Sequence, residues 1–204
     1  MTAVLRSRLD EMRKVVVQQF VTLDGYSAGP NGELDFVTET GAAADPTSGP
    51  FVEDQLAFIE SLDAILLGAV TYRMFAEYWP EQTTETQRIA DALNATPKVV
   101  FSSTLESAPW GSWEPARVVA GSAAEEVRRL KADSGKDMVI WGSLTLADSL
   151  MREGLVDEYR LQVCPVVLGR GKRLFEDGLA TQWLTHLETN TYDDMVAVRY
   201  ASAS

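Results

Sequence analysis

Residues 137–164, DMVIWGSLTLADSLMREGLVDEYRLQVC, decide the fold class of this chain. The apolar run Met138–Trp141 predicts a buried strand, and Ser143–Glu153 has the periodicity of a helix that ends at Gly154. Val156–Cys164 is expected to form a longer strand. A strand, a helix and a strand in this order predict a βαβ unit with parallel strands.

The rest of the chain repeats this alternation and ends in a hairpin. The other expected strands are Lys14–Thr22, Ala64–Leu67, Lys98–Ser102 and Arg117–Ala120. The other expected helices are 50–62, 71–78, 84–94 and one that Ser122 and Glu125 begin as a capping box. An antiparallel hairpin is expected from Trp183–Thr189 and Met195–Tyr200. We therefore predict an α/β domain with a mostly parallel, eight-stranded twisted sheet, helices on both faces and this C-terminal hairpin.

The composition argues against several classes of partner. The 204 residues include 18 Lys and Arg against 30 Asp and Glu, which gives a net charge of −12 at pH 7. A protein that binds nucleic acid or an anionic membrane surface needs a surplus of cationic side chains. No apolar run is long enough for a transmembrane helix. We expect a small-molecule substrate and neither nucleic acid nor membrane as a partner.

Cysteine and histidine usage indicates a reducing compartment and no structural metal. Cys164 is the single cysteine and His186 the single histidine, too few for an internal disulfide or a usual zinc site. Residues 1–12 mix charged with apolar side chains and lack the apolar region of a signal peptide. We interpret residues 1–12 as an N-terminal extension, residues 13–204 as the domain, and the location as cytoplasmic.

Three strand-to-helix junctions carry small and hydroxylated residues. They are LGAVTY at 67–72, FSST at 101–104 and WGSLT at 141–145. Glycine allows a phosphate to approach the backbone, and free N–H groups with the helix dipole attract anions without many Lys or Arg residues. The alternative interpretation is that these residues only form tight turns and cap helices.

The long irregular segment 23–50 is the candidate substrate-facing loop. Asp24 is the candidate catalytic acid, and Glu33 and Asp35 are better explained as turn-forming residues. Aromatic side chains could form a wall for a planar heterocycle, or could belong to the core instead. These aromatic candidates are Tyr26, Phe36, Tyr72 and Trp79.

Four segments together resemble the reductase domain of the riboflavin-biosynthesis deaminase–reductases, in the dihydrofolate reductase superfamily. They are VVVQQFVTLDGYSAGPNGELDFV at 15–37, DAILLGAVTYRMF at 63–75, KVVFSSTLE at 98–106 and DMVIWGSLTLADSLMREGLVDEYRLQVCPVVLGRGKRLFE at 137–176. The resemblance spans about residues 13–200 and includes no deaminase half. It implies a dihydrofolate-reductase-like fold, a homodimer, and NADPH-dependent hydride transfer to a small pterin-like, pyrimidine-like or carbonyl substrate.

The resemblance also implies roles for the junction residues. Gly68 and Thr71 would contact the cofactor phosphates, and the turn from Val21 to Gly25 would flank the nicotinamide. The ribose and 2′-phosphate would lie beside Ser102, Ser103 and Thr104, and the pyrophosphate beside Gly142, Ser143, Leu144 and Thr145. Ala69 follows Gly68 where dihydrofolate reductases commonly carry arginine, so the sequence does not decide whether the cofactor is NADPH or NADH.

Two other functions are compatible with the sequence. The same fold can serve as a non-catalytic nucleotide-binding module. A serine hydrolase would use Ser143 as nucleophile and His186 as base, although the G-x-S-x-G motif is absent. The basic segment Gly169–Arg173 could bind a phosphate or could simply be a solvated turn.

Overall fold

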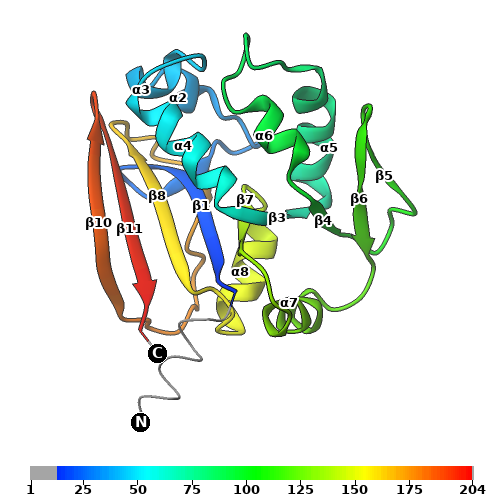
Figure 1. Ribbon diagram of the computed structural model, residues 1–204. Helices are drawn as coiled ribbons and strands as arrows, with labels where there is room; N and C mark the ends of the chain where they lie inside the picture. Colours follow the sequence, from blue (N-terminus) through cyan, green and yellow to red (C-terminus); the bar gives the residue numbers. More distant parts are fainter. Residues whose placement is uncertain (1–12, 204) are drawn as a thin grey trace.

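The computed structural model describes residues 13–203, and its centre is one large mixed sheet (Figure 1). The nine strands of this sheet lie in the order β10-β11-β8-β1-β7-β3-β4-β6-β5. Pairing is parallel from β8 to β6, whereas β5, β10 and β11 pair antiparallel. Their bounds are β1 Val15–Thr22, β3 Leu62–Gly68, β4 Lys98–Phe101, β5 Ala108–Trp110, β6 Trp113–Val119, β7 Asp137–Trp141, β8 Glu158–Cys164, β10 Leu184–Tyr192 and β11 Met195–Ser202.

The predicted α/β class, the mostly parallel sheet and the C-terminal hairpin are confirmed. The predicted count of eight strands is wrong for this sheet, because the segment around Trp110 is not a plain connector. It forms β5, which pairs with β6 across a turn at Gly111, where φ is 55°. Trp110 is 1% exposed and donates its indole N–H to Asn94, so burial of this side chain fixes the extra strand. A separate two-stranded ribbon joins β2 (Tyr26–Ala28) to β9 (Lys172–Arg173).

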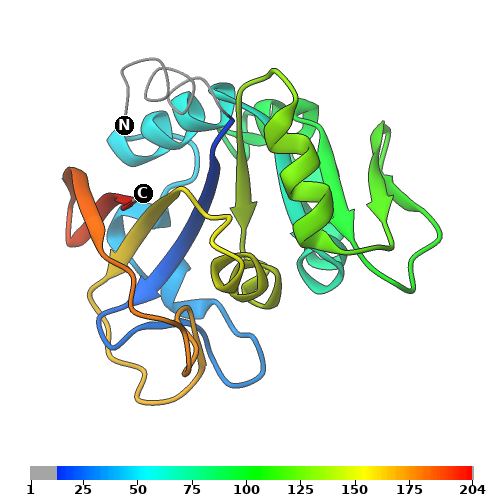
Figure 2. The same cartoon turned by 90° about the horizontal axis from the view of Figure 1, so that it is seen from below.

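Helices cover both faces of the sheet (Figures 1 and 2). Several expected boundaries differ. Leu62 begins β3 instead of ending a helix, and the expected helix 84–94 is helical only from Ala90. The side chain of Ser122 accepts a hydrogen bond from the Glu125 N–H at 3.3 Å, which confirms the predicted cap. The helices are α2 Asp35–Thr38, α3 Gly41–Ala44, α4 Pro50–Glu60, α5 Ala69–Tyr78, α6 Ala90–Ala95, α7 Ala123–Ala132 and α8 Leu144–Arg152, with a 3₁₀ turn, η1, at Trp79–Glu81.

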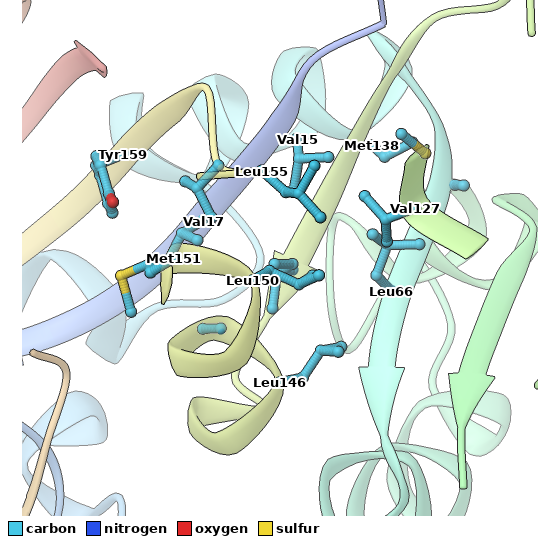
Figure 3. Close-up of a cluster of buried hydrophobic side chains, with 14 of the residues drawn as sticks. Val15, Val17, Leu66, Val127, Met138, Leu146, Leu150, Met151, Leu155 and Tyr159 are labelled. Carbon is cyan, nitrogen blue, oxygen red and sulfur yellow. The ribbon is translucent and has the colours of Figure 1, made fainter. Parts of the chain in front are cut away.

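The core on one face lies between the sheet and helices α7 and α8 (Figure 3). Val15 and Val17 of β1 contribute to it, and Leu146 and Leu150 of α8 pack against the strands. Burial of such side chains stabilises the fold by about 1.5–3 kcal/mol each. This packing holds the start of α8 at the carboxyl end of β7.

Within residues 13–203, no helix is long and apolar enough to cross a membrane. In the same part of the chain, no three His, Cys, Asp or Glu side chains gather as a metal-binding group would. The expected extension 1–12 lies outside the described residues.

Candidate active site

A cavity of about 1100 Å³ opens at the carboxyl ends of the central parallel strands. One part of its lining, which we name the corner part, consists of Gly68–Thr71 and Gly142–Leu146. Another part, which we name the α4 part, consists of Phe20, Phe51, Val52 and Gln55. Ligands of open α/β sheets bind at this edge, because the strand-to-helix connections meet there.

Hydrogen bonds tie the two junctions of the corner part together. The Gly68 N–H donates to Ser143 Oγ at 2.9 Å, and the Ser143 N–H donates to Thr71 Oγ1 at 2.9 Å. Gly142 and Ser143 have φ angles of 62° and 53°, the left-handed region that glycine adopts readily. A Cβ at Gly142 would lie 2.9 Å from Thr71 Cγ2. Glycine at position 142 therefore allows the two corners to approach each other.

Both helices of the corner part begin at the cavity without a side-chain cap. The N-cap residue of α5 is Gly68, which has no side chain to form a cap. The N-cap residue of α8 is Ser143, whose side chain accepts no hydrogen bond from the helix. The first turns, Ala69–Thr71 and Leu144–Leu146, line the cavity. Their free N–H groups and the helix dipoles make this wall attractive to an anion.

The structure brings seven of the predicted site residues together in the cavity lining. They are Gly68, Thr71, Trp79, Gly142, Ser143, Leu144 and Thr145. The predicted Val21, Gly25, Ser102, Ser103 and Thr104 are not part of that lining. Ser102 Oγ instead accepts hydrogen bonds from the N–H groups of Thr104 and Leu105, each at 3.2 Å. Phe101 and Ala123 line the cavity near that position.

The candidate acid Asp24 lies outside the cavity lining and holds a loop in place. Its carboxylate accepts hydrogen bonds from Thr22 Oγ1 at 2.6 Å, from the Gly169 N–H at 2.7 Å and from the Leu168 N–H at 3.2 Å. These bonds, the one from Thr22 first, lower the pKa of Asp24 below its ordinary value. A carboxyl group with a low pKa is ionised at neutral pH, so we do not retain Asp24 as the acid.

Three of the four predicted wall aromatics have other roles. Tyr26 stacks on the guanidinium of Arg173, 4.7 Å from the ring centroid. Phe36 is buried in a core cluster under α4, and Tyr72 donates its hydroxyl hydrogen to the Pro109 carbonyl at 2.8 Å. Trp79 lines the cavity, so it alone of the four stays in the candidate site.

The structure argues against the serine hydrolase. His186 lies on β10 at the edge of the sheet, four strands away from β7, and bonds to Thr189 Oγ1 at 2.8 Å. Ser143 Oγ is occupied by the Gly68 N–H at 2.9 Å and lies next to the Trp141 carbonyl. No base therefore reaches this hydroxyl among the described residues, and the proposed Ser143–His186 pair is wrong.

Several lining residues were missed by the sequence analysis. The most important are Phe20, Phe51, Val52, Gln55, Phe75 and Trp141. The aromatic and aliphatic members have the same pattern as core residues, and only their tertiary position exposes them to the cavity. The polar Gln55, within the apolar face of α4, was a signal that could have been used.

The segment 23–50 borders the cavity as expected, through Ser27, Ala28, Gly32, Leu34, Val37, Thr38, Ala43 and Pro46. The basic segment reaches it through Lys172 of β9, which pairs with Ala28 of β2. Lys172 is the sole charged side chain among the described residues of the lining. The cavity is otherwise made of apolar side chains, small polar side chains and backbone.

Comparison with known proteins places this architecture in a family. The RibD C-terminal domain family matches residues 13–198. The chain is 32% identical to the uncharacterized protein YyaP of Bacillus subtilis over 188 residues, covering 91% of this chain and 93% of the relative. A protein of Shewanella sp. PV-4 named for riboflavin biosynthesis has the same fold, with 20% identity, a TM-score of 0.75 and coverage of 94% and 99%.

A second solved structure extends the likeness of the fold. The dihydrofolate reductase of Enterococcus faecalis, solved with NADP(H), is similar with a TM-score of 0.58 and 12% identity, over 94% of this chain and 97% of that one. At this identity the comparison shows a shared fold. Because the family match spans almost the whole described domain, the chain belongs to the RibD C-terminal domain family.

Proposed function

We propose that the protein is a reductase that binds a reduced nicotinamide dinucleotide, NADPH by resemblance, and passes a hydride to a small planar substrate. The observation that carries this proposal is the corner part, where two uncapped helix N-termini are tied together at the wall of one large cavity. The family and the reductase-type fold support it. The expected cytoplasmic location and homodimer stay predictions.

The residues present fit a dinucleotide in two respects. The cavity, at about 1100 Å³, exceeds the upper range of ordinary small-molecule pockets, about 1,000 Å³, so it can hold a cofactor beside a substrate. In the proposed arrangement, the free N–H groups of Leu144 and Thr145 at the start of α8 hold the pyrophosphate, and those of Ala69–Thr71 at the start of α5 hold a further phosphate. Reduced nicotinamide, when bound, supplies the hydride from its ring.

The chain's own contribution is to bind, to orient and to exclude water. The interlocked corners fix the direction of the N–H groups before a ligand arrives, which reduces the ordering cost of binding. Aromatic side chains, Phe75 and Trp141 among them, cover the cavity and limit access of water to the reacting groups. With Asp24 set aside, the proton for the reduced product comes from water.

Ligand-induced stabilisation tests this proposal directly. Unfolding is followed by thermal shift with NADPH, with NADH and without nucleotide. A nucleotide at about one hundred times its dissociation constant stabilises the folded state by about 2.7 kcal/mol. We expect a shift, and the difference between the two nucleotides measures the preference of the protein for the 2′-phosphate. Absence of a shift with both nucleotides contradicts the proposal. Binding without oxidation of NADPH by any acceptor would indicate a non-catalytic nucleotide-binding module.

A further inference from the structure

A buried pair of glutamines borders the α4 part of the cavity. Gln18 of β1 is 0% exposed and Gln55 of α4 is 4% exposed. The Gln18 side-chain amide donates a hydrogen bond from Nε2 to Gln55 Oε1 at 2.7 Å. This bond leaves Gln55 Nε2 without a protein partner among the described residues. A buried donor without a partner destabilises the fold, so a function for it must be sought.

Gln55 is the member of this pair that reaches the cavity. Its side chain lines the cavity together with Phe51 and Val52, the neighbouring residues on the same helix, whereas Gln18 does not. Phe20 of β1 completes this wall, and its ring meets that of Phe51 edge to face with centroids 5.9 Å apart. An amide donor without a protein partner among the described residues is thus buried within an apolar, partly aromatic wall, and such a wall suits a flat molecule with one polar edge.

The neighbouring charges do not enter the cavity. Arg160 of β8, the register partner of Gln18, binds the carboxylate of Asp54 and lies over the Phe58 ring, 4.4 Å from its centroid. Neither Arg160 nor Asp54 lines the cavity. The two charges therefore neutralise each other beneath α4, and the α4 part presents an amide and not an ion to a ligand.

The charges in the cavity lining limit which hydride acceptor can bind there as the substrate. No Asp or Glu lines the cavity among the described residues, so a cationic heterocycle would be buried without a counter-charge. Lys172 is the sole cation there, and it lies on β9 beside β2 and outside the α4 part. A phosphorylated acceptor carries a charge of about −1.5 to −2 at pH 7 and would find at most one ammonium group. An uncharged acceptor avoids both costs.

We propose that the α4 part takes an uncharged, planar, conjugated carbonyl compound, and that Gln55 selects it by donating a hydrogen bond from Nε2 to its carbonyl oxygen. This inference rests on the proposed reductase function for its chemical step. In that step a carbon–hydrogen bond forms at the acceptor as the hydride arrives, and the nicotinamide is oxidised. The acceptor carbonyl is reduced, and its oxygen takes a proton from water.

The test uses a matched pair of quinones as probes. 1,4-Naphthoquinone is planar and uncharged, and 1,4-naphthoquinone-2-sulfonate carries one negative charge on the same rings. Dissociation constants are measured by quenching of tryptophan fluorescence, since Trp79 and Trp141 line the cavity. We expect the uncharged quinone to bind at least about tenfold more tightly, a difference of about 1.4 kcal/mol. Equal or tighter binding of the sulfonate overturns the inference.

Two substitutions of Gln55 examine the hydrogen bond. Gln55→Glu keeps an oxygen that accepts from Gln18 Nε2 but loses the N–H donor, and Gln55→Met removes both polar atoms at similar volume. Both variants should weaken naphthoquinone binding by about tenfold. Gln87→Met is the matched control, because Gln87 also borders the cavity but its amide already donates to Tyr78 Oη at 2.6 Å. Undiminished affinity in Gln55→Glu overturns the assignment of Nε2 as donor.

Folding and cofactor binding are measured separately on each variant. Circular dichroism and the melting temperature establish that a variant is folded, and if Gln55→Glu is not, Gln55→Met decides. NADPH binding is followed by thermal shift without quinone. If NADPH binds and naphthoquinone affinity is independent of Gln55, the inference fails and the proposed function stands. If naphthoquinone binds through Gln55 and NADPH does not bind, the proposed cofactor fails and the acceptor subsite stands.

Discussion

The corner part and the α4 part border the same cavity but are made from different kinds of residues. In the corner part, short polar side chains and backbone groups bond to one another, as Ser143 does with Gly68 and Thr71. In the α4 part, large apolar side chains surround Gln55, whose amide donor has no protein partner in the described chain. In the corner part the protein's own hydrogen bonds fix the backbone geometry, whereas in the α4 part a side-chain donor is left without a protein partner among the described residues.

This difference indicates how the two parts would respond to mutation. The corner part depends on backbone geometry, so a single added methyl group disturbs binding and stability together. The α4 part depends on side-chain chemistry, so a substitution there can change ligand preference and leave the backbone in place. Substitutions in each part therefore separate these two kinds of dependence.

The largest effect is expected from Gly142→Ala in the corner part. A left-handed residue other than glycine costs about 1–2 kcal/mol, and the new Cβ would also lie 2.9 Å from Thr71 Cγ2. The contact forces apart the Ser143 N–H and Thr71 Oγ1 and misdirects the N–H groups at the start of α8. We expect NADPH affinity to fall at least about tenfold, measured by titration of nucleotide fluorescence.

Gly154→Ala is the control for this substitution. Gly154 has a φ of 64°, close to the 62° of Gly142, but no atom lies within 4 Å of its added Cβ. It should lose a similar amount of stability, about 1–2 kcal/mol, without loss of NADPH affinity. Equal affinity losses in the two variants would show that backbone strain alone, and not the contact between the corners, weakens binding.

The corner part could be predicted from sequence because its signals are local. An apolar strand followed by Gly-Ser-Leu-Thr predicts a tight turn into a helix, and the first and third junctions do line the cavity. The second junction shares the hydroxylated residues but has no glycine, and it forms a turn that Ser102 closes on itself and that leads to β5 and not to a helix. The order of strands and helices followed from the same local periodicity.

The α4 part could not be predicted, because the local sequence pattern of a cavity wall is the same as that of the core. Phe20 belongs to a buried strand, and Phe51 and Val52 belong to the apolar face of a helix. Phe51 and Val52 share one buried cluster with Phe36, so only tertiary packing decides that they also border the cavity and that Phe36 does not. Strand β5 was missed for a similar reason, since burial of Trp110 and not local propensity holds it.

Lys98 is a buried polar residue outside the cavity and can be compared with Gln55. Lys98 is 4% exposed, and its ammonium group bonds to the Asn94 carbonyl and lies 4.5 Å from the centroid of the Trp110 ring. Burial lowers the pKa of Lys98 to about 7. Unlike Gln55, this polar group has its partner within the fold, so its effect should appear in stability and not in ligand binding.

Lys98 predicts a rise in stability with pH. The unfolded chain holds the lysine proton up to about pH 10.4, whereas the folded state releases it near pH 7. The free energy of unfolding should therefore increase by roughly 2–4 kcal/mol between pH 7 and pH 10 and vary little from this cause below pH 7. Urea unfolding of wild type and Lys98→Met across this range measures the effect. Parallel profiles for the two proteins would contradict it.

The smallest effect on turnover is expected from Asp24→Asn, which tests whether the site needs an acid from the 23–50 segment. The Asp24 carboxylate accepts three hydrogen bonds that lower its pKa, so it is ionised at pH 7 and has no proton to give. Asparagine still offers an oxygen to the Gly169 N–H. We expect NADPH-dependent reduction of 1,4-naphthoquinone at pH 7 to change by less than about threefold, whereas loss of a general acid would cost about 10²–10⁴-fold.

The stability of the same variant at acid pH provides a second measurement, in which a change is expected. Because the pKa of Asp24 is lowered on folding, its stabilising effect is present above the ordinary value of 3.8 and is lost as the pH falls through the lower folded value. Asp24→Asn should therefore be less stable than wild type near neutral pH and should converge with it in acid. A variant that loses turnover at pH 7 without this convergence would restore Asp24 as the proton donor.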